Sequence, residues 1–198
     1  MKKKKKKVII TVISSILLIM IITIINKNLS KTYYHEDTNI NNYNLYIGVN
    51  AQKPYRNKWD MNETIFPDQI RTGMSVIDYK MVYYDSFDKQ FLSYLVVEWS
   101  EDTFPIEKDR LIKYSSTNYK GYFSIYDFPE EFDLLAVEAD PDKGIIYALS
   151  KNTTIIYVEL IFCNYYYDLE YNNIIPQEYL PLGFDATADN PYRKQMGY

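Results

Sequence analysis

The chain has 198 residues and a mass of 23.6 kDa, with 22 basic side chains, 26 acidic side chains, one His, one Cys and 22 Tyr. Its hydrophobic content of 47% and its charged content of 24% are ordinary for a globular protein, which argues against a mainly disordered chain and against a multi-span membrane protein. The single cysteine excludes an intramolecular disulfide and any metal site built from several thiolates.

The N-terminal 25 residues have the pattern of a membrane anchor. Six lysines at positions 2–7 precede residues 8–25, an apolar stretch without a single charge. A helix of this length spans about 27 Å, close to the thickness of a hydrocarbon core. Only two lysines follow the stretch closely, so the positive-inside rule predicts a cytoplasmic N-terminus. We therefore expect residues 1–7 to be a cytoplasmic basic tail, residues 8–25 to be a single-pass transmembrane signal-anchor helix in the cell membrane, and the remainder to be extracytoplasmic.

Three alternatives for the apolar stretch have less support. A cleaved secretory signal peptide has a shorter apolar region and small residues at the cleavage site, whereas residues 26–30 offer no such site. A lipid anchor would need a cysteine close to the span, and the chain has none there. A helix buried in a protein core would not be flanked by a run of lysines.

Charge is unevenly distributed along the chain. Without the six N-terminal lysines, 16 basic side chains remain against 26 acidic ones, which gives the rest of the chain a net charge of −10. Such a charge repels phosphates, so we expect no nucleic-acid partner. The expected partners are the lipid bilayer, through residues 8–25, and either another envelope protein or the cell-wall glycan.

Composition divides the exported part into three regions. Residues 26–42 are rich in Asn, Lys, Thr and Tyr and lack apolar periodicity, so we expect a polar stalk, which contains His35. Residues 43–184 are expected to form one sheet-rich domain, long enough to bury about two thirds of its unfolded surface. Residues 185–198 are expected to be a polar C-terminal tail.

Strand signals dominate the expected domain. Residues 74–84 alternate between apolar and polar side chains, and residues 91–99 are almost continuously apolar, as in a strand covered on both faces. Residues 85–89 between them are expected to form a hairpin loop. A second group predicts a three-stranded antiparallel meander. Its strands are expected at 132–139, 145–150 and 154–163, joined by tight loops at 140–144 and 151–153.

Helical signals are weaker. Residues 105–114 follow Asp102 and Thr103, either of which can cap a helix, and they carry apolar residues for one buried side. A further short strand is expected at 122–126. The predicted fold class is α+β: an N-terminal transmembrane helix followed by one mainly antiparallel β-sheet domain with one or two short helices.

The sequence offers few candidates for nucleophilic catalysis. The chain order His35, Cys163, Arg193 resembles that of sortases, which are also anchored at the N-terminus and carry these three residue types. Sortases place the cysteine after a Thr-Leu-x-Thr motif, whereas residues 160–162 here are Leu-Ile-Phe. We therefore expect a solvated His35 and a Cys163 that serves as a small buried hydrophobe.

Hydrolysis of a sugar bond would need two carboxylates on one wall of a cleft. Glu138 and Glu159 both interrupt apolar strands, but the register expected from the tight loops places them on opposite faces of the sheet. Glu98, Glu101 and Asp102 cluster at a strand end, where helix-capping and surface roles explain them more simply.

Signals for a metal or a small ligand are also weak. Asp140-x-Asp142-x-Gly144 resembles the opening of a calcium loop, but Lys151 stands where an EF-hand has its final Glu, so a turn is the better explanation. No Gly-rich phosphate loop and no hydrolase motif is present, and we expect no cofactor. Tyrosine clusters at 33–34, 83–84 and 165–167 could offer stacking surfaces for a sugar or a protein.

The leading hypothesis is a single-pass, membrane-anchored, extracytoplasmic binding or interaction module of the cell envelope without catalytic activity. The alternative is a carboxylate-dependent hydrolase that acts on cell-wall polysaccharide. No residue is predicted to be catalytic or to bind a cofactor or a metal. An exposed aromatic patch would favour the first hypothesis, and two acids that converge in a pocket would favour the second.

Overall fold

The computed structural model describes residues 16–21, 32–48, 50–61 and 63–198. The chain divides into two compact units, Met1–Tyr33 and Tyr34–Tyr198. In the first unit, residues 16–21 are helical and their side chains are exposed, while the rest of the predicted span 8–25 and the basic tail 1–7 lie outside the described residues. Within the described ranges, no helix combines the length and the apolar character that a membrane crossing requires.

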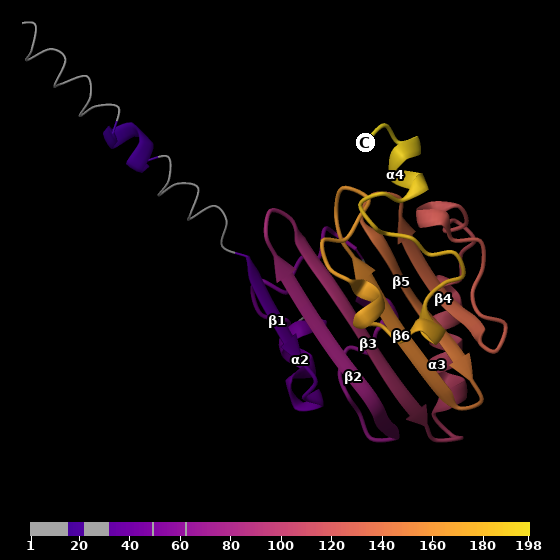
Figure 1. Cartoon of the computed structure of the whole chain (residues 1–198). Coiled ribbons are helices and arrows are strands. Elements are labelled where there is room, and N and C mark those ends of the chain that lie inside the picture. The colour runs from indigo at the N-terminus through magenta and orange to yellow at the C-terminus, as the bar shows by residue number, and fades with distance from the viewer. Residues whose placement is uncertain (1–15, 22–31, 49, 62) are drawn as a thin grey trace, which may run out of the picture. The chain divides into compact units, whose positions relative to one another are not determined.

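The second unit is built on one six-stranded sheet with the strand order β1-β2-β3-β6-β5-β4 (Figure 1). The β2–β3, β3–β6, β5–β6 and β4–β5 pairs are antiparallel, which confirms a mainly antiparallel sheet domain. The strands are β1 (Tyr33–Asp37), β2 (Met74–Asp85), β3 (Lys89–Trp99), β4 (Asp133–Asp140), β5 (Gly144–Lys151) and β6 (Thr154–Ile161).

Short helices cover the sheet. Helix α3 has a Pro in its first turn, where the missing N–H costs no hydrogen bond, and η3 continues it. Together they cover the whole of the expected helix 105–114. The α-helices are α2 (Tyr43–Tyr46), α3 (Phe104–Leu111) and α4 (Pro191–Gln195). The 3-10 turns are η1 (Ile40–Asn42), η2 (Glu63–Ile65), η3 (Ile112–Tyr114), η4 (Tyr122–Ser124), η5 (Tyr171–Asn173) and η6 (Gln177–Tyr179).

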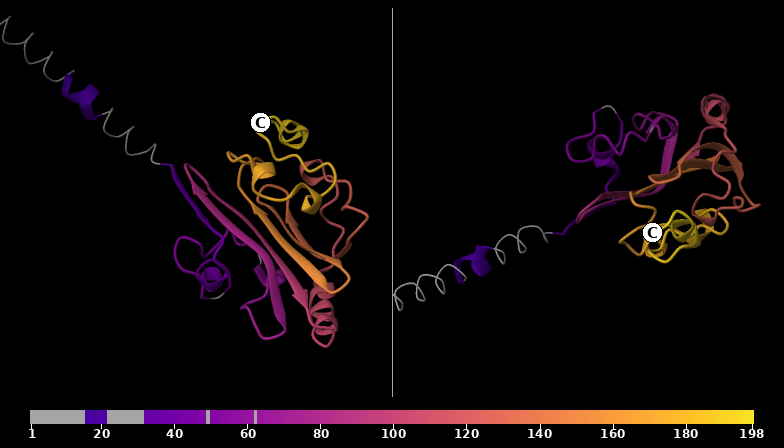
Figure 2. Two further views of the ribbon diagram at one scale, coloured as in Figure 1. Left: turned by 60° about the horizontal axis from the view of Figure 1, so that its bottom comes forward. Right: turned by 90° about the horizontal axis from the view of Figure 1, so that it is seen from above.

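Both faces of the sheet are covered, which explains the continuous apolar runs of its central strands. Figure 2 shows segments from the first half of the second unit on one face and C-terminal segments on the other. The first face packs against residues 43–66 and Leu111, with Tyr79, Leu95 and Tyr157 among its buried side chains. The second face packs against residues from the ranges 119–128 and 162–192. All but the last residue of β5 are buried, as this two-sided core requires.

The short strand expected at 122–126 is wrong, because this segment forms the 3-10 turn η4 instead. Phe123 and Ser124 have φ values of 49° and 65°, in the left-handed region, which no strand can accommodate. Asp127, three residues after Ser124, forms an isolated bridge with Leu182 and belongs to none of the six strands. The buried ring of Phe123 thus belongs to a turn and not to a sheet.

The sheet begins earlier in the chain than the expected domain boundary at Tyr43. Residues 33–37, placed in the expected stalk, form the edge strand β1, and Lys80 of β2 forms an ion pair with Glu36 at 3.1 Å. In the expected tail 185–198, Ala186 and Asn190 are fully buried. The folded unit therefore includes segments on both sides of 43–184.

Glu138 and Glu159 point to the same face of the sheet, so the expectation of opposite faces is wrong. Glu138 pairs with Ile146 as expected, but Glu159 also pairs with Ile146 and not with Ile145. One row across three strands thus contains both acids, with Ile146 between them. Since neighbouring strands lie about 4.8 Å apart, the two backbones are separated by about 10 Å.

The shift of one residue arises in the hairpin between β5 and β6. Lys151 pairs with Thr154, which leaves a loop of two residues where three were expected. Asn152 in this loop has a φ of 56°, and Asn is one of the few residues besides Gly that adopt this conformation readily. Two-residue loops of this kind match the twist of the flanking strands, so the tighter turn is favoured.

Candidate functional site

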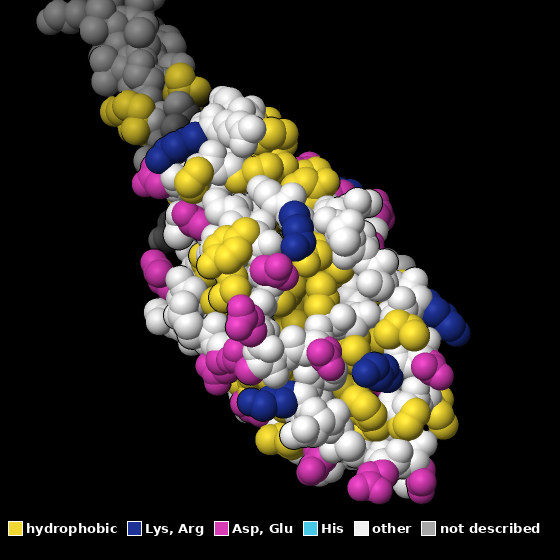
Figure 3. Space-filling model, turned by 90° about the vertical axis from the view of Figure 1, so that its right-hand side faces the viewer, with side chains coloured by type: hydrophobic (Ala, Val, Ile, Leu, Met, Phe, Trp, Pro, Cys, Tyr) yellow, Lys and Arg dark blue, Asp and Glu magenta, His cyan; other side chains and the backbone are white. Residues whose placement is uncertain are grey.

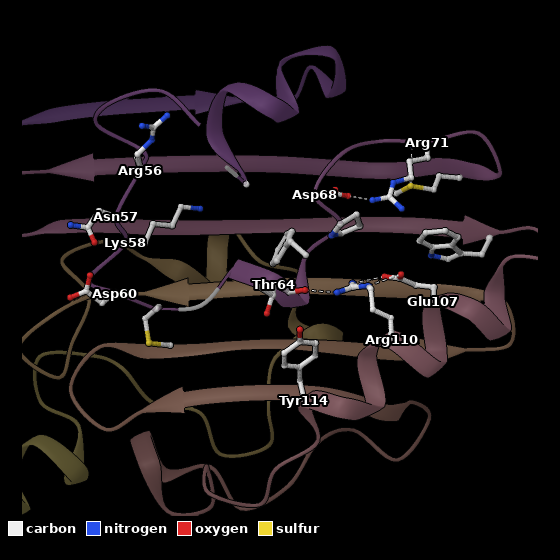
Figure 4. A pocket seen from close by; sticks show the side chains of 16 residues that line it. Arg56, Asn57, Lys58, Asp60, Thr64, Asp68, Arg71, Glu107, Arg110 and Tyr114 are labelled. Carbon is white, nitrogen blue, oxygen red and sulfur yellow. Dashed lines mark hydrogen bonds and ion pairs between the residues drawn. The ribbon is translucent and has the colours of Figure 1, made fainter. Parts of the chain in front are cut away.

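A cavity of about 600 Å³ lies between the first face of the sheet, the irregular segment 48–71 and helix α3 (Figure 4). This size is in the range of sites that hold small organic ligands. Apolar and charged side chains share its wall. The lining residues are Gly48, Arg56, Asn57, Lys58, Asp60, Met61, Thr64, Phe66, Pro67, Asp68, Arg71, Met74, Trp99, Glu107, Arg110 and Tyr114.

The segment on one side of the cavity has an unusual backbone. Asn57, Trp59 and Asp60 have φ values of 66°, 54° and 61°, so three of four successive residues are left-handed. This conformation costs roughly 1–2 kcal/mol for a residue such as Trp59 and less for Asn and Asp, so surrounding contacts must enforce it at Trp59 above all. Lys58 is the one residue of 57–60 without a left-handed backbone, and its side chain anchors the segment to the sheet.

Lys58 forms a buried ion pair with Glu159 of β6. The Nζ atom lies 2.8 Å from each carboxylate oxygen, and both side chains are only 1% exposed. Ser93 of β3 donates a third hydrogen bond to Oε1 at 2.6 Å. The Lys58 ammonium also lies 5.5 Å from the ring centroid of Phe91, close enough for a cation–π interaction. The irregular segment is thus attached to the middle of the sheet through one charged side chain.

A second charged group joins helix α3 to the sheet and to the same segment. Glu107 accepts two hydrogen bonds from the Arg110 guanidinium, at 2.8 and 2.6 Å, and one from the Tyr157 hydroxyl at 2.7 Å. Arg110 also donates to the backbone carbonyls of Thr64 and Ile65. The arrangement satisfies both oxygens of Glu107 and ties η2 to α3.

These contacts shift the protonation equilibria of two groups. Burial, together with the neighbouring charge of Glu107, raises the pKa of the Tyr157 hydroxyl well above its ordinary value. Burial alone would lower the pKa of Arg110, but the hydrogen bonds and charge of Glu107 outweigh it and raise that pKa. Tyr157 therefore remains a neutral donor and Arg110 remains a cation.

The third group of lining residues lies where β2 begins and β3 ends. Trp99 pairs with Met74 across these strands, and the backbone N–H of Ser100 donates to the Gly73 carbonyl at 3.1 Å. Arg71, in the turn before β2, forms an exposed ion pair with Asp68. In Figure 4, Asp68, Arg71, Glu107 and Arg110 occupy one end of the cavity, and Arg56, Asn57, Lys58 and Asp60 occupy the other.

The indole N–H of Trp99 is buried and makes no hydrogen bond to any of the described residues. A buried donor without a partner costs about 1–3 kcal/mol, so such groups are rare in stable cores. The hydroxyl of Tyr79, elsewhere on the same sheet face, is also buried without a hydrogen bond to any of the described residues. Of these two, only Trp99 belongs to the cavity wall.

The charges around the cavity balance. Its wall carries four cations and three carboxylates, and the fourth cation, Lys58, is neutralised by Glu159 behind the wall. The buried acids are held by a lysine or an arginine, so neither is positioned as a general acid or base. The cavity can hold an organic ligand by apolar contact and hydrogen bonds, while no pair of converging free acids is present among its lining residues.

The three residues of the sortase-like order, His35, Cys163 and Arg193, each have different side-chain neighbours. His35 Nε2 lies 3.1 Å from the Tyr46 hydroxyl, and its ring packs near Tyr46 and Tyr55. Arg193 stacks over the Tyr166 ring at 4.7 Å. Cys163 is half-buried, and burial followed by the nearby charge of Asp88 raises the pKa of its thiol to about 11, which disfavours the thiolate.

The remaining sequence candidates do not assemble into a site. Glu98, Glu101 and Asp102 are exposed. In the 140–144 turn, the hydrogen bond between the two carboxylates raises the pKa of Asp142. Burial alone would raise the pKa of Asp140, but its hydrogen bonds with Asp142 and the charge of Lys143 outweigh burial and lower that pKa. Across the described ranges, no group of three or more His, Cys, Asp or Glu side chains is arranged to hold a metal ion.

The tyrosine clusters are divided between core and surface. Tyr83 and Tyr167 are buried in the two cores, whereas Tyr33 and Tyr34 are about half exposed. In the view of Figure 3, acidic, basic and apolar side chains are interspersed, and no extended area of one charge covers this side of the molecule.

The cavity residues lie in segments with little sequence signal. Residues 48–71 show no periodicity, and Lys58 is separated from Glu159 by 101 positions. The one usable signal was Glu159 itself, a charge within a strand of otherwise apolar residues, which requires a buried counter-ion. No protein-family model, no curated protein and no solved structure matches this chain.

Proposed function

We propose that this chain is a non-catalytic binding module of the cell envelope, held in the membrane by residues 8–25, and that the cavity beside α3 is its ligand site. The ligand is a soluble fragment of the envelope, of the size of a small organic molecule. The domain that follows the anchor presents the cavity outside the membrane.

The observation that carries the proposal is the combination of an open cavity with fully engaged buried charges. Glu107 and Glu159 are the buried acids nearest to the cavity, and both are held by a cation. A binding site needs such a rigid wall, since locked side chains lose little entropy when a ligand enters. A catalytic site would instead need an acid or base free to exchange a proton with the substrate.

The hydrolase alternative has one observation in its favour and two against it. Glu138 and Glu159 share a sheet face at a backbone spacing of about 10 Å, which is compatible with a pair of catalytic carboxylates. Ile146 stands between them, however, and Glu159 is completely buried against Lys58.

The test uses the full chain in phospholipid nanodiscs and fluorescently labelled glycan–peptide fragments from an enzymatic digest of bacterial cell wall. Thr64→Trp fills the cavity, because the exposed Thr64 side chain lies on its wall. Thr117→Trp adds the same bulk at an exposed site outside the wall and serves as the control. We expect saturable binding that Thr64→Trp abolishes and Thr117→Trp retains, with the fragments recovered intact by mass spectrometry.

Two results would contradict the proposal. Equal binding by the Thr64→Trp variant would show that the cavity is not the site. Cleavage of the fragments that is lost with Glu107→Gln or Glu138→Gln would establish the hydrolase instead.

A further inference from the structure

Hydrogen-bond donors and acceptors are used to different extents at one end of the cavity. At the end that contains Arg71, Arg110 and Trp99, the acceptors are largely used, because Glu107 already accepts three hydrogen bonds. The donors are not used to the same extent. Among the described residues, the Arg71 guanidinium makes one hydrogen bond, to Asp68, and the Trp99 indole N–H makes none.

The geometry points to a ligand that carries a carboxylate on an apolar body, with the carboxylate bound at the Arg71–Trp99 end; this inference rests on the proposed function of the cavity. A carboxylate supplies only acceptors, and it matches the planar fork of a guanidinium. An ionised acceptor on an indole N–H forms a charge-assisted hydrogen bond, roughly twice as strong as a neutral one.

The position of Trp99 supports this assignment. Its strand end is fixed to the start of β2, since Trp99 pairs with Met74 and the Met74 N–H donates to the Arg71 carbonyl at 3.2 Å. The indole and the Arg71 turn therefore belong to one rigid corner. The indole nitrogen is covered by neighbouring atoms, so a bond to it requires a side-chain shift on binding, which the exposed Arg71 and the flexible Met74 allow.

The remaining wall suits the apolar body. Met61, Phe66 and Pro67 are buried residues of the irregular segment and form the apolar part of the lining. A cavity of about 600 Å³ exceeds the volume of a carboxylate several-fold, so most of a ligand would lie against these side chains. The carboxylate fixes the orientation, and the apolar contact provides area.

The experiment compares matched probes on the full chain in nanodiscs. The probes are 3-phenylpropionate and its amide, and the tripeptide acetyl-Ala-Ala-Phe with a free or an amidated C-terminus. The chain has two tryptophans, and the Trp59 indole donates to the Lys89 carbonyl at 2.8 Å outside the cavity wall. In a Trp59→Phe background, fluorescence excited at 295 nm therefore reports on Trp99 alone.

We expect each free acid to bind at least about tenfold more tightly than its amide, since a hydrogen bond to a charged group contributes about one to two powers of ten in affinity. Arg71→Gln and, measured by calorimetry, Trp99→Phe should each remove most of this preference. Arg193→Gln should leave the preference intact, because Arg193 stacks on Tyr166 outside the cavity wall. Binding of only one acid would assign the carboxylate to that source, a free organic acid or a peptide C-terminus.

The outcomes separate this inference from the proposed function. Acid and amide probes that bind equally, and that Thr64→Trp displaces, would overturn the carboxylate preference while leaving the cavity as a ligand site. An acid preference that survives both Arg71→Gln and Trp99→Phe would overturn the assignment of these two residues. Absence of binding by all four probes would also overturn the inference, whereas binding of wall fragments would still test the proposed function separately.

Discussion

Removal of the buried ammonium of Lys58 tests the ion pair that attaches the irregular segment to the sheet. Lys58→Met keeps an unbranched apolar side chain that ends where Cε of the lysine lies, but among the described residues it leaves the buried Glu159 carboxylate with only the hydrogen bond from Ser93. Breaking one half of a buried pair costs about 3–5 kcal/mol, because the remaining charge is uncompensated. This loss is a large part of the 5–15 kcal/mol that typically stabilises a domain.

The assay is urea unfolding of the full chain in nanodiscs, followed by tryptophan fluorescence. With a denaturant dependence of about 2 kcal/mol per molar urea, a loss of 4 kcal/mol lowers the unfolding midpoint by about 2 M. The matched control is Lys80→Met, which removes a partly exposed pair with Glu36 and should cost less than about 1 kcal/mol.

A second variant separates the charge from the side-chain volume. In Lys58→Met combined with Glu159→Gln, the neutral amide still accepts the Ser93 hydrogen bond. The double variant should therefore recover at least half of the stability lost in the single variant. The reasoning is refuted if Lys58→Met shifts the midpoint no more than Lys80→Met, or if the double variant is no more stable than the single one.

Three further predictions concern other parts of the fold. Gly144→Ala should prevent stable folding, because a Cβ there would lie 2.0 Å from a carbonyl oxygen of β6, and the cooperative urea transition should be lost. The control is Gly121→Ala, which is also at positive φ but has no atom within 4 Å of the added Cβ and should cost only about 1–2 kcal/mol. Cys163 should react with iodoacetamide at pH 8 about 100-fold more slowly than a free thiol, as its pKa of about 11 requires, and a rate equal to that of free cysteine would contradict this. Asp37→Asn should lower the melting temperature at pH 7 but not at pH 2. Burial raises the pKa of Asp37, but hydrogen bonds from Tyr46, Asn39 and Asn42 outweigh burial and lower the pKa overall, so the contribution of Asp37 to stability is present above about pH 4 and is lost as the pH falls through the lower folded value.

The strands of the central sheet could be predicted because their signals are local. Residues 91–99 and 145–150 differ from the observed strands by at most two residues at either end. Continuous burial on both faces requires an apolar side chain at nearly every position, and that pattern is visible without knowledge of the partners. The strand predicted at 122–126 is wrong, because the backbone is left-handed at Phe123 and Ser124.

Strand register depended on the length of one hairpin loop, which composition does not predict. The choice between a two-residue and a three-residue loop after Lys151 decides on which face Glu159 lies, because a shift by one residue inverts every side chain of a strand. The left-handed conformation of Asn152 favours the shorter loop. With the shorter loop, the Glu159 side chain points to the first face of the sheet, where it is buried.

The cavity could not be predicted, because its wall is held in place by contacts across the whole sequence rather than by a motif. The backbone is left-handed at Asn57, Trp59 and Asp60. The side chain of Lys58, which lies between Asn57 and Trp59 in the sequence, is fixed by its ion pair with Glu159 of β6. The left-handed conformation of Trp59 alone costs about 1–2 kcal/mol, and loss of the ion pair costs about 3–5 kcal/mol more. If the pair fails, the segment keeps the hydrogen bond from the Trp59 indole to the Lys89 carbonyl but loses its charged contact with β6, and the cavity wall next to Lys58 should relax. Ligand binding and the stability of the ion pair are therefore coupled, and Lys58→Met should weaken binding even though Arg71 and Trp99, at the other end of the wall, are unchanged.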